Sequence, residues 1–112
     1  MKRLIPLLFI MLAACKSEMP DMPDDIMPID QMKVILADMH IADAIAETKA
    51  LGGGNEKILT EEYYLQIYKN NHVTEQEFVK SYNYYKANPE WMNKLYEEVL
   101  NEVSKRTANV SK

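Results

Sequence analysis

The main pattern in this chain is the recurrence of apolar residues at three- and four-residue steps, the spacing of one face of an α-helix. The first such stripe follows Asp30, a good N-cap, and stops at Gly52-Gly53-Gly54. Ile41 and Ile45 lie on a second apolar side, which is typical of a helix at the centre of a bundle. The pattern therefore predicts a central helix over residues 30–51. Its main stripe consists of Met32, Ile35, Leu36, Met39, Ala42 and Ala46.

A second helix is predicted from Thr60 to the pair Asn70-Asn71. Acidic residues in its first turn suit the positive end of the helix dipole, and Asn tolerates the left-handed backbone that often ends a helix. Its apolar face combines Tyr64, Ile67 and Tyr68.

Two further helices have clear start signals. Thr74 and Glu77 have the spacing of a capping box, and Phe78, Tyr82 and Tyr85 form the stripe that follows. Asn88-Pro89 ends this helix and starts the next, because Asn caps a helix and Pro fits its first position. The last stripe consists of Met92, Leu95, Tyr96, Val99, Leu100 and Val103. Since no segment alternates like a β-strand, the sequence predicts an all-α fold, a small bundle of four helices.

The N-terminus has a different pattern. Lys2 and Arg3 precede an apolar run over residues 4–14 that ends in the small residues Ala13-Ala14. A charged start, a short apolar core and small residues before a cleavage point are typical of a secretory signal peptide. The run is much shorter than the roughly 20 residues of a membrane-spanning helix. Residues 1–14 are therefore expected to be removed after export.

Cys15 follows this signal and is the only cysteine in the chain. The sequence Leu12-Ala13-Ala14-Cys15 resembles the lipobox of bacterial lipoproteins, in which cleavage occurs after Ala14. The resemblance implies that Cys15 carries a thioether-linked diacylglycerol, often with a further palmitate-type chain on its amino group. Two or more chains attach a protein stably to a membrane. Lipidation also explains a single cysteine in an exported protein.

Charge and proline content divide the rest of the chain. Residues 16–28 hold prolines and acids, which predicts a flexible tether over residues 15–28 with a reach of roughly 30–40 Å. Residues 29–106 are expected to form the helical domain, and residues 107–112 a frayed tail. Without residues 1–14 the chain has 11 basic and 17 acidic side chains (13 − 2 and 17 − 0), a net charge of −6. This acidity argues against a nucleic-acid partner.

Several segments resemble the lipoprotein family called domain of unknown function 4296, typical of Bacteroidetes. The apolar run into Asp38-Met39-His40-Ile41-Ala42 resembles the family's first helix, and Tyr63-Tyr64, His72-Val73-Thr74 and Asn88-Pro89 match later positions. The likeness covers about residues 30–104. His72 stands where the family favours glycine. The resemblance implies a small helical envelope lipoprotein and transfers no catalytic residue.

Candidate chemistry is sparse. His40 and Asp43 could face one point on the first helix, but two ligands do not make a zinc site. We therefore expect no metal and no cofactor, and we expect His40 to bond a carboxylate or backbone group inside the bundle. Ser81 and Ser104 have no strained Gly-x-Ser-x-Gly elbow, so the chain is not expected to be an enzyme.

The aromatic residues are the most suggestive set. Tyrosine buries its ring while its hydroxyl seeks a partner, which suits the edge of a core or a binding interface. The candidate binding surface comprises Tyr64, Tyr68, Tyr82, Tyr84, Tyr85 and Trp91. We expect a non-enzymatic envelope lipoprotein of the outer membrane that binds a protein partner or acts as an accessory scaffold. The alternative is a glycan- or peptidoglycan-binding domain that stacks sugars on exposed tyrosines and Trp91, and an enzyme built around His40 ranks below both.

We predict that Cys15→Ser will prevent both lipid attachment and removal of residues 1–14, because the thiol accepts the lipid before the signal is cleaved. Intact-mass measurement of protein extracted from membranes checks this. The unaltered protein should begin at Cys15 and carry acyl chains. A start at Met1 without added fatty chains would contradict the lipoprotein interpretation.

Overall fold

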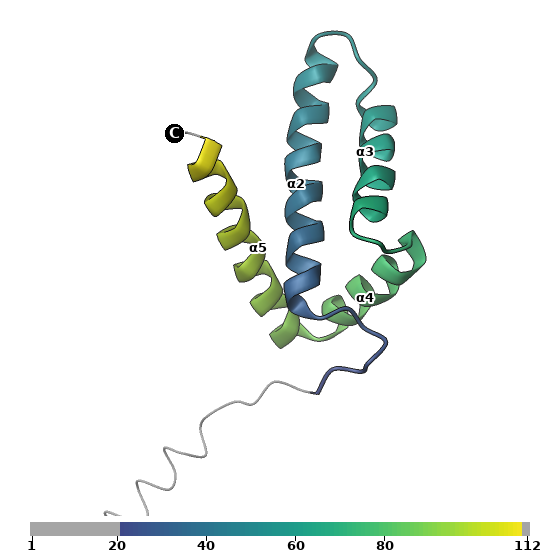
Figure 1. The fold of residues 1–112 in the computed structure, drawn as a ribbon, viewed down its shortest axis with the longest axis vertical. Coiled ribbons are helices and arrows are strands. Elements are labelled where there is room, and N and C mark those ends of the chain that lie inside the picture. The colour runs from purple at the N-terminus through teal and green to yellow at the C-terminus, as the bar shows by residue number, and fades with distance from the viewer. Residues whose placement is uncertain (1–20, 111–112) are drawn as a thin grey trace, which may run out of the picture.

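A computed structural model describes residues 21–110, and within this range the chain forms four helices and no strand (Figure 1). The predicted all-α fold is therefore confirmed. The predicted signal peptide and Cys15 lie outside the described residues. No helix in the described range is long and apolar enough to cross a membrane. The elements are α2 (Ile29–Leu51), α3 (Glu56–Asn70), α4 (Glu75–Ala87) and α5 (Pro89–Val110).

Helix α2 is the centre of the arrangement, as its two apolar sides predict. It stands between α3 and α5 and packs against both, while α4 crosses the end at which α2 begins (Figure 1). Helix α3 runs antiparallel to α2. Helix α5 starts beside the first turn of α2 and diverges from it towards the C-terminus (Figure 1).

Two helix starts differ from the prediction. Helix α3 begins at Glu56 instead of Thr60, because the Asn55 side chain caps it by accepting from the Ile58 N–H at 3.2 Å. The preceding turn fits this short connection because Gly53 has a φ of 107°, which side-chain-bearing residues rarely adopt. At α2, Pro28 takes the N-cap position instead of Asp30, and its carbonyl accepts from the backbone N–H of Met32 at 3.0 Å.

The predicted capping box of α4 is confirmed. The Thr74 hydroxyl accepts from the Glu77 N–H at 3.1 Å, and the Glu77 carboxylate accepts from the Thr74 N–H at 3.0 Å. His72, two residues earlier, has a φ of 57°. This left-handed backbone explains why glycine would suit the position, since it avoids a steric penalty of about 1–2 kcal/mol.

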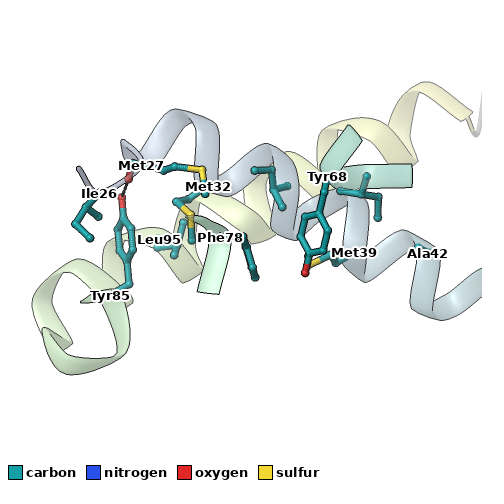
Figure 2. Packing of buried hydrophobic residues seen from close by; sticks show 11 residues of the cluster. Ile26, Met27, Met32, Met39, Ala42, Tyr68, Phe78, Tyr85 and Leu95 are labelled. Carbon is teal, nitrogen blue, oxygen red and sulfur yellow. Dashed lines mark hydrogen bonds between the residues drawn. The ribbon is translucent and has the colours of Figure 1, made fainter. Parts of the chain in front are cut away.

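The core forms where α2, α4 and α5 meet. Met32, Leu95 and Tyr85 are fully buried there (Figure 2). Ile35 of the same cluster is also fully buried. The rings of Tyr85 and Trp91 meet edge to face, with centroids 6.2 Å apart. Burial of each large apolar side chain contributes about 1.5–3 kcal/mol, so this cluster is the main source of stability in a fold of this size.

Residues 21–28, which we call the N-terminal strap, are packed against the bundle. Ile26 and Met27 are buried. The Met27 N–H donates to the buried Ser81 hydroxyl at 2.9 Å. The Tyr85 hydroxyl donates to the Met27 carbonyl at 2.7 Å (Figure 2). Asp25 forms an ion pair with Lys80. The expected tether over residues 15–28 is therefore wrong for its last part, because α4 supplies hydrogen-bond partners that proline and acid content does not reveal.

The hydroxyl of Tyr85 links this packing to pH. Burial, with a smaller effect from Tyr84, raises the pKa of Tyr85 from 10 to about 12. The pKa of Tyr85 is higher in the folded than in the unfolded state. The protonated hydroxyl therefore contributes its full stabilisation below pH 10, and this contribution is lost as the pH rises towards 12.

We predict that Tyr85→Phe lowers the free energy of unfolding by about 1–2 kcal/mol, because the buried Met27 carbonyl loses its donor. The melting temperature should fall by roughly 4–8 °C for each kcal/mol lost. The variant should also lose less stability than the unaltered protein between pH 10 and pH 12. Thermal unfolding followed by circular dichroism measures both effects.

Tyr84→Phe is the matched control, because the Tyr84 hydroxyl donates to the Asp21 carbonyl at 3.2 Å in an exposed position. It should change the melting temperature much less. Equal losses in the two variants would contradict the central role of the Tyr85 bond.

Candidate functional site

An apolar groove with a volume of about 370 Å³ lies beside α2, and all four helices contribute to it. Helix α2 forms one wall and α5 the other, while α4 closes one end and α3 contributes a single residue near the opposite end. The lining residues are Leu36, Met39, His40 and Asp43 of α2, Tyr64 of α3, Phe78 and Tyr82 of α4, and Met92, Leu95, Tyr96 and Val99 of α5.

The groove joins the core to the surface. Leu95, Met39 and Phe78 belong to the buried cluster, so the floor of the groove is held rigidly. Tyr82 stacks on Phe78 with centroids 5.7 Å apart and the ring planes 12° from parallel. At the rim, the side chain of Tyr96 is 65 % exposed. A molecule in the groove would meet a fixed apolar floor and an accessible aromatic edge.

One end of the groove is polar. The Tyr64 hydroxyl donates to the Asp43 carboxylate, with distances of 2.9 and 3.1 Å to its two oxygens. This bond ties α3 to α2 across the groove. Burial, and then the Asp43 carboxylate, raises the pKa of Tyr64 to about 12, so Tyr64 is neutral and remains a donor at physiological pH. Within residues 21–110, no Lys or Arg lines the groove.

His40 also borders the groove, and its side chain is exposed. The expectation that His40 bonds a group inside the bundle is therefore wrong. The reason is its position on α2. The neighbouring Met39 takes the inward-facing site, and His40 points about 100° away around the helix.

Asp38 lies on the other side of α2, as its spacing from His40 predicts. Its carboxylate pairs with Arg106 of α5 and accepts from the Asn71 side-chain amide at 3.3 Å. Glu102 also accepts from Arg106, at 3.0 Å, and this bond lowers the pKa of Glu102. These contacts fasten α5 and the end of α3 to α2. In the described part of the chain, no group of three or more His, Cys, Asp or Glu side chains could hold a metal ion.

The six predicted aromatic residues have three different positions. Tyr64 and Tyr82 line the groove. Tyr68 and Tyr85 are buried in the core, so neither can be part of a binding surface. Their burial agrees with the other interpretation of the tyrosines, as amphipathic parts of the core.

The remaining two aromatic residues are half-buried next to the N-terminal strap and the core. The Tyr84 hydroxyl donates to the strap at Asp21, and Trp91 packs edge-on against Tyr85. Tyr96, which the predicted surface omits, is the most exposed aromatic residue that lines the groove. Its position in the stripe of the last helix could have suggested a role, but only the divergence of α5 from α2 leaves it at a rim.

A family described as Domain of unknown function (DUF4296) matches residues 23–109. No curated protein and no solved structure matches.

We predict that Asp43→Asn lowers the pKa of Tyr64 from about 12 but leaves it above 10. The substitution removes the neighbouring negative charge, while burial, the larger cause, persists. Titration of carbon-labelled tyrosine followed by NMR, with Tyr64 assigned from Tyr64→Phe, measures the change. Asp30→Asn, a change in an exposed acid of the first turn of α2, should leave the pKa of Tyr64 unaltered. An unchanged value in Asp43→Asn would contradict the observed hydrogen bond.

Proposed function

Because this chain belongs to the DUF4296 family, a domain of unknown function, we propose that it is a lipid-anchored envelope protein whose helical domain binds another protein without catalysis. The observation that carries the proposal is the apolar groove beside α2, with Tyr64, Tyr82 and Tyr96 along it. Aromatic residues around an apolar floor are enriched at protein interfaces.

The anchor is supported by the N-terminal sequence. Lys2 and Arg3, the apolar run over residues 4–14 and the small residues before Cys15 together fit a lipoprotein signal. Lipid on Cys15 would place the domain at the bacterial envelope. Lys16 after the cysteine, in place of the aspartate associated with inner-membrane retention, favours the outer membrane of a bacterium of the Bacteroidetes type.

A protein partner fits the groove better than a glycan does. Sugar stacking requires a flat, accessible aromatic face. Trp91, the best platform in the sequence, is half-buried against Tyr85, and one face of the Tyr82 ring is stacked on Phe78. The groove instead offers aliphatic and thioether groups, such as Leu36, which favour apolar side chains.

The absence of catalysis is supported by how the candidate groups are used. Ser81 is buried and accepts from the Met27 N–H, and the Asp43 carboxylate accepts from the Tyr64 hydroxyl. Tyr64 is a weak acid with a pKa of about 12. Covalent catalysis requires an accessible nucleophile that an adjacent base activates, and neither the buried Ser81 nor the protonated Tyr64 meets this requirement.

Crosslinking in living cells tests the proposed function. A photoreactive benzoylphenylalanine incorporated at Tyr96, on the groove rim, should yield a discrete protein adduct that mass spectrometry identifies. The same amino acid at Val79, an exposed apolar position of α4 outside the groove, is the matched control and should not yield that adduct. No adduct at Tyr96, or identical adducts at both positions, would overturn the proposal.

A further inference from the structure

We propose that the groove receives a short amphipathic helix of the partner protein and that a Lys or Arg at one end of this helix meets Asp43. This inference rests on the proposed protein-binding function and specifies its ligand. It is carried by three properties of the groove, namely its length, the elements that enclose it and its charge.

The length matches a helix of about two turns. On α2 the lining runs from Leu36 to Asp43, and on α5 from Met92 to Val99. Each wall therefore covers seven residue steps, or about 10.5 Å at 1.5 Å per residue. A docked helix with apolar residues at positions i, i+3, i+4 and i+7 spans the same distance.

The helices around the groove leave room beside α2 for one more helix. Helix α5 diverges from α2, and α3 lies along the other side of α2 (Figure 1). Leu36 and Val99 are half-buried and line the groove, and the exposed Tyr96 lies at its rim. A helix placed in the groove would pack its side chains between those of α2 and α5, at the usual interaxial distance of roughly 8–10 Å.

The charge orients the ligand. Asp43 at the polar end accepts hydrogen bonds from Tyr64 alone among the described residues, and no ion pair involves Asp43 in that range. Glu47 and Glu61 lie one turn beyond Asp43 and Tyr64 on the same helix faces. The opposite end is formed by Phe78 and by Tyr82, whose ring has the Lys86 ammonium 5.2 Å from its centroid. A basic residue at the Asp43 end is therefore complementary, and an acidic residue is repelled.

Two synthetic peptides test this inference. Each has about four helical turns, Leu at positions i, i+3, i+4 and i+7, and a polar remainder, and the two differ only in having Lys or Glu at the end that faces Asp43. Fluorescence anisotropy of the labelled peptides measures their binding to the full chain. If the chain is lipidated, it is held in lipid nanodiscs for this measurement. We expect saturable binding of the Lys peptide and about fivefold weaker binding of the Glu peptide.

Variants of the protein locate the contact. Asp43→Asn should remove the difference between the two peptides, whereas Asp30→Asn, an exposed acid outside the groove, should preserve it. Tyr96→Ala should weaken the binding of both peptides, and Val79→Ala should leave the binding of both unchanged. These substitutions are at exposed positions, so they keep the fold and isolate binding.

Three results would overturn the inference. They are no saturable binding of either peptide, a peptide preference that persists in Asp43→Asn, and self-association of the chain that Tyr96→Ala abolishes. The third would make a second copy of this chain the occupant. A specific adduct with another protein at Tyr96 in cells, together with either of the first two results, would leave the proposed function standing and reject only the helical, basic ligand.

Discussion

The structure depends on the double hydrogen bond between α4 and the backbone of Met27. Ser81 accepts from the Met27 N–H, and Tyr85 donates to the Met27 carbonyl, so one buried peptide segment has a partner on each side. Buried backbone groups without partners would cost about 1–3 kcal/mol each. By satisfying both, α4 fixes where the chain enters α2, and it also places Phe78 and Tyr82 at the closed end of the groove.

The groove follows from a second constraint, the way in which α5 is fastened. Its first turns pack into the core through Leu95, and its far end is held through Arg106, which pairs with Asp38 on the side of α2 away from His40. With α5 fixed in this way, Tyr96 lies at a rim and Asp43 lies opposite Tyr64. The groove is thus a result of helix divergence and does not depend on any single motif.

Local sequence signals predicted most of the fold. The three- and four-residue spacing identified the buried face of α2, and Thr74 and Glu77 formed the expected capping box. Helix α3 starts earlier than the sequence predicts, because Asn55 directly follows three glycines and its residue type there also fits a continued turn. The strap was missed because its partners, Ser81 and Tyr85, are more than 50 residues away in sequence. The groove combines residues of four helices, and periodicity along one helix does not reveal which faces of different helices meet.

The strap would limit how far the domain can stand from a membrane under the proposed lipid anchor. With the chain fixed from Asp21 onward, only six residue steps separate Cys15 from the folded body, and covalent geometry limits them to about 20 Å. This reach is about half of the 30–40 Å that the proline and acid content of residues 16–28 alone predicts. A lipid at Cys15 would keep the α4 side of the domain close to the bilayer and point the glycine turn between α2 and α3 outward. The Asp43 end of the groove would then face away from the lipid surface, towards approaching proteins.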